Sequence, residues 1–334
     1  MILKLKNKAY ITHFSCVGGK EEHRGPLGAA LDFYDETDRF DQKTWEKSES
    51  EMQRRALSIL LAKAKRKPDD IEMLIAGDLI NQCTSSNYGL LDFDIPYVGI
   101  YGACSTAAEG LGLSALFCSA GYAKRAAVVT SSHFCSAERQ FRYPLEYGSQ
   151  RTPTSQHTAT AAGAFMIENE GSGAYIGEVM FGITNDGGIT DANNMGAAMA
   201  PAVVDTLTRY FKDSGRKPED FDLIITGDLG HEGYMIVKEL MLQLGYDMQK
   251  NFYDCGLMIY DRSRADMHAG GSGCGCSAFA LAASVIPDII SGKYKDVLFI
   301  GTGALLSQAS VLQGESIPAV AHLIRIRSSE GNDA

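Results

Sequence analysis

Continuous apolar runs alternate with alanine-rich stretches along this chain. The runs at 126–130 and 297–300 are not interrupted by alternating polar residues, a pattern typical of strands that are covered on both faces. Before each run lie a glycine-rich turn and a long alanine-rich stretch with the composition of a helix. Strands that alternate with helices predict parallel sheets with helices packed on the outside.

Two segments far apart in the chain are nearly the same. Residues 66–79 and 216–229 both begin with Arg-Lys-Pro and end with Gly-Asp-Leu, and eight of their fourteen aligned positions are identical. The offset of 150 residues is too long for a solenoid repeat and suits a duplicated half-domain. We therefore predict two related α/β halves, residues 1–172 and 173–334, that meet around a central pocket.

Composition and charge disfavour several classes of function. The 334 residues are 45% hydrophobic and carry a net charge of −10 without a cluster of lysine or arginine, which disfavours binding of nucleic acid or, unaided, of a lipid surface. No apolar stretch approaches the roughly 18 residues of a spanning helix, and residues 1–14 lack the apolar core of a signal peptide. We expect a protein of the cytosol or of the cytosolic face of a membrane.

The cysteines are not spaced as disulfide pairs or as metal ligands. All eight are expected to be free thiols. Cys274 and Cys276 near His268 superficially resemble a metal cluster, but two cysteines separated by one residue, without a second pair, are poor zinc spacing. We expect no metal and no cofactor. His133 and His157 have no partner motif and are interpreted as ordinary histidines.

Cys104 is the most suggestive single residue. It follows a predicted buried strand at 97–101 and precedes a helix that begins near Ser105. The free N–H groups at a helix N-terminus lower the pKa of a thiol, and they can equally hold a carboxylate. The alternative is that Cys104 is a small buried residue that fills a tight turn.

The duplicated halves and their glycine-rich turns at 102–106 and 270–277 resemble the thiolase and ketoacyl-synthase III superfamily. More narrowly, the chain is similar along almost its whole length to the stage V sporulation protein AD family of endospore-forming bacteria. This resemblance implies a thiolase-like fold with five layers in the order αβαβα. The segments that carry the narrower resemblance are 25–28, 76–82, 102–106, 130–133, 137–144, 254–260, 301–307 and 315–318.

The resemblance also implies a function. It implies non-catalytic binding of dipicolinic acid (pyridine-2,6-dicarboxylate), with or without calcium, by a subunit of the machinery for its uptake and release during sporulation and germination. Such a subunit is expected to lie peripherally on the inner membrane of the forespore, held there by membrane-embedded subunits. Superfamily members commonly form homodimers, and the strand end at 130–133 is the candidate edge for this contact.

The residues themselves argue against synthase chemistry. A ketoacyl synthase needs two polar partners beside its cysteine, His and Asn or two His, to hold an oxyanion. Asp228 stands near the first expected position and would repel an oxyanion, and Ser272 stands at the second. His231 and His268 lie a few residues away and could enter through a shifted loop. The alternative function is therefore a ketoacyl-synthase III-like acyltransferase with Cys104 as nucleophile.

The pseudo-symmetry predicts which polar side chains converge on the pocket. Helix N–H groups could hold one carboxylate of a flat dicarboxylate, and amide and hydroxyl donors the other. Asp78 and Asp228 could instead be turn or N-cap residues, an interpretation favoured by their equivalent places in the two halves. The expected ligand-binding residues are Asp78, Asn81, Cys104, Asp228, Ser272 and Ser307.

A long polar passage at 136–155 connects the two halves and holds three arginines. A loop of this length in a compact domain is usually functional or a partner surface. Arginines pair well with carboxylates, but solvent exposure or a dimer contact is the favoured interpretation here. The three are Arg139, Arg142 and Arg151.

Overall fold

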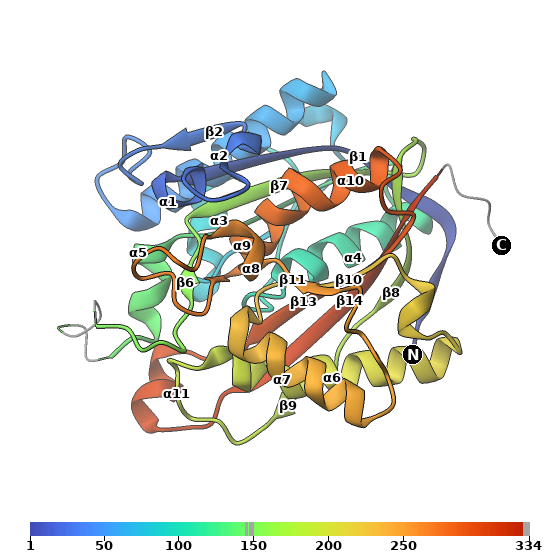
Figure 1. The fold of residues 1–334 in the computed structure, drawn as a ribbon. Coiled ribbons are helices and arrows are strands. Elements are labelled where there is room, and N and C mark those ends of the chain that lie inside the picture. The colour runs from blue at the N-terminus through green and yellow to red at the C-terminus, as the bar shows by residue number, and fades with distance from the viewer. Residues whose placement is uncertain (144–145, 147–149, 330–334) are drawn as a thin grey trace.

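The computed structural model describes residues 1–143, 146 and 150–329, and within them the two halves contain corresponding elements (Figure 1). The helices and strands of the first half are β1 (Leu3–Gly19), α1 (Lys20–His23), β2 (Phe33–Asp35), α2 (Trp45–Ala64), β3 (Met73–Gly77), α3 (Thr84–Gly89), β4 (Tyr97–Gly99), α4 (Thr106–Ser119), β5 (Arg125–Ser132), α5 (Phe134–Ala137), β6 (His157–Thr158) and β7 (Ala161–Glu168). Those of the second half are β8 (Ala174–Met180), β9 (Asn185–Asp186), α6 (Met195–Ser214), β10 (Leu223–Thr226), α7 (Gly230–Gln243), β11 (Phe252–Asp254), α8 (Gly256–Ile259), β12 (Gly271–Ser272), α9 (Cys274–Ala280), α10 (Ile286–Ile290), β13 (Asp296–Ala304), α11 (Gln308–Gln313) and β14 (Pro318–Ser328).

The strand order confirms the predicted duplication. The main path of the sheet runs β4-β3-β5-β7-β1 through the first half and continues β8-β14-β13-β10-β11 through the second. The second series repeats the first in reverse, so the two halves are related about the antiparallel β1–β8 pair at the centre. The predicted boundary at residue 172 lies in the connection between β7 and β8. The division into two domains stays a prediction, because one hydrogen-bonded sheet runs through both halves.

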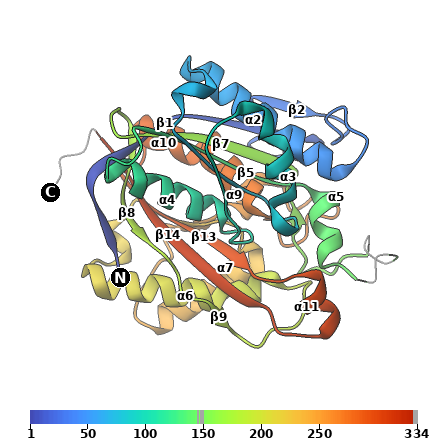
Figure 2. The same ribbon diagram turned by 180° about the vertical axis from the view of Figure 1, so that it is seen from behind.

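The helices form layers around the two halves of the sheet. Helix α4 lies between the halves and packs against β1 and β5 on one side and β13 and β14 on the other, and α9 packs beside it on β5 and β7 (Figures 1 and 2). Helix α2 covers the outer face of the first half, and α6 with α7 covers the outer side of the second. This arrangement confirms the predicted thiolase-like architecture with helices inside and outside two sheet layers.

The repeated Arg-Lys-Pro segments have the same local structure. In each, the carboxylate of an aspartate accepts a hydrogen bond from the backbone N–H of the lysine three residues earlier, at 2.8 Å for both Asp70 with Lys67 and Asp220 with Lys217. The proline occupies the first position of the short 3-10 turn, where its fixed φ is favourable. The turn redirects the chain from α2 into β3, and from α6 into β10.

Two predictions about individual strands were wrong. Strand β4, expected to be buried, is the edge strand of its half, and Tyr97 and Val98 are 38% and 45% exposed. The segment 130–133, predicted as a dimer edge, is fully buried because β5 lies between β3 and β7. The predicted burial of 126–130 and 297–300 is confirmed.

Candidate functional site

Cys104 lies in a tight turn between β4 and α4. The turn requires a left-handed backbone at Ala103 (φ +50°), and it ends where Ser105 begins α4. The thiol is buried, and its Sγ lies 3.9 Å from the hydroxyl of Ser272 on β12. The glycine-rich turns of the two halves therefore meet at this sulfur, as the duplication predicted.

Asp228 lies beside this thiol at the end of β10 and is fixed by hydrogen bonds from two other segments. Its Oδ1 accepts a hydrogen bond from Thr302 Oγ1 at 2.5 Å. Its Oδ2 accepts from Ser272 Oγ at 3.0 Å and from the backbone N–H of Gly273 at 2.7 Å. The carboxylate consequently ties the loop after β10 to the end of β12 and to β13, next to Cys104.

These surroundings shift the pKa of the thiol in the direction opposite to the predicted one. Burial, followed by the negative charge of Asp228, raises the pKa of Cys104 well above its ordinary value. Burial also raises the pKa of Asp228, in spite of the hydrogen bonds that stabilise its charge. The expectation that the N-terminus of α4 lowers the pKa of Cys104 was therefore wrong, because desolvation and a neighbouring carboxylate outweigh the helix.

None of the seven histidines, all of which the structure describes, lines the cavity at Cys104. His231 contacts Arg262 at 3.1 Å, and His268 lies 3.4 Å from the carboxylate of Asp266. Neither loop is shifted in the way that would bring an imidazole to the sulfur. The thiol thus has a hydroxyl and a carboxyl group as neighbours instead of an imidazole.

The cavity at Cys104 is small. Its volume is about 30 Å³, enough for one or two water molecules, whereas pockets for small molecules typically measure about 300–1,000 Å³. Its walls are mostly apolar and come from both halves. The lining residues are Leu79, Tyr101, Ala103, Cys104, Ala137, Gln140, Phe141, Thr158, Met195, Ser272, Ala304 and Leu306.

A second hollow of about 400 Å³ lies immediately outside the first. Tyr101 and Leu306 line both, so these two side chains separate the small cavity from the larger hollow. Asn81 and Ser307 lie here together rather than at Cys104, and Gln82 adds a further amide. The remaining lining residues are Leu305 and Ser310.

Asp78 lines neither space. Its carboxylate accepts hydrogen bonds from the backbone N–H of Ile80 at 2.9 Å and from the N–H and hydroxyl of Ser86 at 2.8 and 2.7 Å. It therefore holds the loop between β3 and α3, as the turn interpretation proposed. Of the six predicted residues, the structure brings Cys104, Asp228 and Ser272 together, places Asn81 and Ser307 in the adjacent hollow, and leaves Asp78 apart.

The arginines predicted to face solvent are partly buried in ion pairs. Arg142 Nε donates to Glu138 at 2.6 Å, and Arg151, whose side chain is 1% exposed, lies 3.5 Å from the same carboxylate. Only Arg139 is substantially exposed, and it pairs with Glu46 on α2. Parts of the 136–155 passage, including Pro144, lie outside the described residues. All three arginines pair with protein carboxylates rather than facing solvent unpaired.

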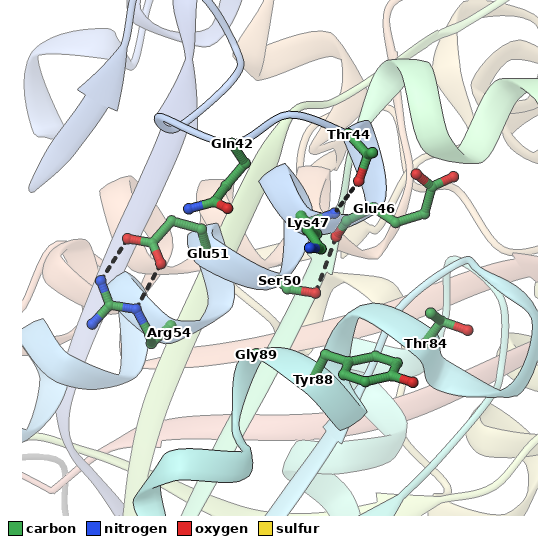
Figure 3. Close-up of a pocket in the computed structure, with 10 residues that line it drawn as sticks. All are labelled: Gln42, Thr44, Glu46, Lys47, Ser50, Glu51, Arg54, Thr84, Tyr88 and Gly89. Carbon is green, nitrogen blue, oxygen red and sulfur yellow. Dashed lines mark hydrogen bonds and ion pairs between the residues drawn. The ribbon is translucent and has the colours of Figure 1, made fainter.

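A larger hollow lies away from this region, on the outside of the first half. It has a volume of about 450 Å³ and lies between α2 and α3, where Arg54 and Glu51 pair along one wall (Figure 3). None of the six predicted residues lines it, and it does not face the junction of the halves. Its lining residues are Gln42, Thr44, Glu46, Lys47, Ser50, Glu51, Arg54, Thr84, Tyr88 and Gly89.

Sequence reasoning missed several residues of the cavity. Thr302, which binds Asp228, follows the buried strand run of the second half, and its place on a glycine-flanked strand end could have indicated a loop at the pocket. Gln140 and Phe141 lie in 137–144, a segment of the family resemblance to which no pocket role was given, and Met195 comes from a connecting segment with no repeat and no motif. No signal in one sequence identifies them.

The fold and site define a thiolase-like protein with a buried cysteine and without a neighbouring imidazole. A variant of OleA from Xanthomonas campestris superposes with a TM-score of 0.61 at 13% identity, covering 97% of this chain and 99% of that one. A 3-oxoacyl-(acyl carrier protein) synthase III from Xanthomonas oryzae pv. oryzae superposes with a TM-score of 0.58 at 13% identity, covering 96% of this chain and all of that one. At this identity the likeness concerns the fold alone.

Sequence comparison places the chain more narrowly. The family model for stage V sporulation protein AD matches residues 1–327. Stage V sporulation protein AD of Bacillus subtilis (strain 168) is 41% identical over 314 residues, which cover 94% of this chain and 92% of that protein. The chain belongs to the stage V sporulation protein AD family. No helix in the described ranges has the length and apolar character needed to span a membrane.

Proposed function

We propose that this sporulation protein binds dipicolinic acid without catalysing a reaction, in the hollow outside the Cys104 cavity. The observation that carries the proposal is that a polar hollow large enough for a small molecule lies next to a cysteine whose own cavity is too small for one. The hollow of about 400 Å³ falls in the range for small-molecule sites, whereas the cavity at the sulfur does not. A planar ring can pack against Tyr101, and the amide and hydroxyl groups of the hollow can donate hydrogen bonds to its carboxylates.

The donors of the hollow support a polar ligand. The side-chain amide of Asn81 makes no hydrogen bond to another described residue, so its donor and acceptor are free for a ligand. Ser307 caps the short helix α11, and its hydroxyl accepts from the N–H of Ser310 at 3.2 Å. The Ser307 hydroxyl also donates to Ser310 Oγ, and the two oxygens are 3.3 Å apart. Asn81 is therefore the stronger candidate contact.

Charge favours the calcium chelate over the free dianion. No lysine or arginine lines the hollow, the chain has a net charge of −10, and Asp228 lies beneath the adjoining cavity. A dianion would enter without a compensating cation, which is costly in a partly desolvated site. The one-to-one chelate is neutral and avoids this cost. We propose the chelate as the bound form, delivered to or from membrane-embedded subunits of the same assembly.

Titration calorimetry with dipicolinate, with and without equimolar calcium, tests the proposal. We expect binding that strengthens when calcium is present. Asn81→Ala should weaken the affinity about tenfold, the order of one lost hydrogen bond. The matched control is Asn169→Ala, on the turn after β7 and outside the hollow. No heat with either form of the ligand at millimolar concentration would contradict binding.

The catalytic alternative has its own measurement. The protein is incubated with acyl-coenzyme A, and peptide mass spectrometry measures acylation at Cys104. We expect no stable adduct, because burial and the neighbouring Asp228 raise the pKa of the thiol and no imidazole lines the cavity to activate it. An acyl group on Cys104 that turns over would establish an acyltransferase instead.

A further inference from the structure

We propose that residues 138–143 form a movable roof that closes the Cys104 cavity and, on opening, exposes it. Two residues of this segment, Gln140 and Phe141, line the small cavity. They face the floor formed by Cys104 and Ser272 from the opposite side of the space. This inference concerns access to the sulfur and does not require that the ligand be dipicolinate.

The backbone of the roof has few hydrogen bonds to the rest of the described structure: the N–H of Glu138, at its first residue, donates to the carbonyl of Phe134 in α5. The backbone bonds of Phe141 and Arg142 both return to the carbonyl of Glu138, at 3.2 and 2.9 Å, and stay within the segment. No described strand or helix outside it shares a backbone bond with residues 139–143. Residues 139–143, attached mainly by side chains, can therefore move without breaking a sheet or a long helix.

Several side chains hold the roof closed: Arg139 pairs with Glu46, Glu138 pairs with Arg151 and accepts from the N–H of Thr158, and Arg142 and Phe141 make the contacts next to the cavity. Arg142 donates to Glu138 at 2.6 Å and, through Nη1, to Asn193 Oδ1 at 2.8 Å, which fastens the roof to the segment before α6. Phe141 is 8% exposed and packs with Met195 at the edge of the apolar core of the second half. These contacts can be broken and remade together.

Closure leaves two buried polar groups without protein partners. The amide oxygen of Gln140 and the Nη2 of Arg142 are both buried and make no hydrogen bond to any described residue. Unpaired buried polar groups are costly, and water or a ligand would satisfy them on opening. The closed roof is therefore less stable than it would be if both groups had hydrogen-bond partners. Opening would remove the wall that confines the cavity to about 30 Å³.

The rate at which N-ethylmaleimide alkylates Cys104 in the native protein tests the roof. Peptide mass spectrometry compares Cys104 with Cys255, which is fully buried, lies away from the roof and also has a strongly raised pKa. If the roof opens, Cys104 reacts faster than Cys255, whose exposure requires more extensive unfolding. Equal rates for the two thiols in the unmodified protein would overturn the proposal.

Arg142→Met removes the fastening and should raise the ratio of the Cys104 rate to the Cys255 rate about tenfold, the order of one charged hydrogen bond. The matched control is Arg209→Met, since Arg209 also pairs with a carboxylate four residues earlier, Asp205, but lies on α6 away from the roof. An unchanged ratio in Arg142→Met, or an equal rise in Arg209→Met, would contradict the roof.

Phe141→Ala provides a second variant should Arg142→Met fail to fold. It removes the apolar contact with Met195 and opens the cavity wall without disturbing an ion pair. We expect the same rise in the Cys104 ratio. An unchanged ratio here would equally overturn the proposal, whatever the outcome of the dipicolinate titrations.

Discussion

At the scale of single residues, Asp228 decides the chemistry of the site. Its carboxylate lies under Cys104, fixed by Thr302, Ser272 and the N–H of Gly273. Its duplicate, Asp78, holds a turn and touches neither cavity. Equivalent positions in the two halves have therefore acquired different roles, which the repeated Gly-Asp-Leu could not reveal.

Buried carboxyl groups make stability depend on pH. Burial raises the pKa of Glu49 to about 8 and those of Glu22 and Asp254 to about 7. The folded state therefore holds protons that the unfolded state has lost. Stability from these groups is complete at low pH and is lost as pH rises through the folded pKa values. Buried histidines oppose this below about pH 6.5, because burial lowers their pKa values to about 4, 3 and 4. They are His133, His157 and His322.

The free energy of unfolding should accordingly fall between about pH 6.5 and 8. Glu49→Gln should remove up to about 1.4 kcal/mol per pH unit of this slope, the contribution of one proton. Urea denaturation at several pH values across this window measures the slope of the unfolding free energy against pH. Ser131 and Ser136 donate to different oxygens of this carboxyl group, so the amide oxygen of glutamine can accept from one serine while its NH2 donates to the hydroxyl oxygen of the other. A slope identical to that of the unmodified protein would refute the assignment to Glu49.

At the scale of elements, the repeated motif and the continuous apolar runs were sufficient to predict the fold. They specified helix, turn and strand in both halves, and the structure has the same capped turn at both places. The exposure of β4 could not be predicted, because an apolar run at an exposed edge has the same pattern as one that is covered. The raised pKa of Cys104 could not be predicted either, since it depends first on the complete burial of the thiol and then on how close Asp228 of the other half comes to it.

The duplicated caps should contribute equally to stability. Asp70→Ala and Asp220→Ala each leave the N–H of a lysine without its acceptor, and each should cost about 1 kcal/mol. Urea denaturation measures the change. Asp69→Ala and Glu219→Ala are the matched controls, because these exposed neighbours do not cap the turn. Costs that differ strongly between the two caps would show that the turns are not energetically equivalent.

At the scale of the whole molecule, β4 is an unpaired sheet edge with exposed apolar side chains. We propose that two copies of the chain pair along this edge, in place of the buried 130–133 segment. Edge strands with apolar surfaces favour such pairing. The exposed side chains near this edge are Tyr88, Leu91, Tyr97, Val98 and Tyr101.

Val98→Asp should convert the dimer to a monomer, because it places a charge in the proposed interface. Val98 is 45% exposed, so the fold of each copy should tolerate the change. Sedimentation velocity reports the mass. The control is Tyr253→Asp on β11, the equivalent edge of the second half, where Tyr253 is 43% exposed. A dimer that persists in Val98→Asp, or dissociates only in Tyr253→Asp, would refute pairing along β4.

The burial of the thiols has a consequence for survival over long storage. Seven of the eight cysteines are buried and the eighth, Cys135, is partly so, and burial raises the pKa of every one. Peroxides attack the thiolate, and its fraction here is very low at neutral pH. We therefore expect the sulfur atoms of the folded protein to stay reduced through long exposure to peroxide.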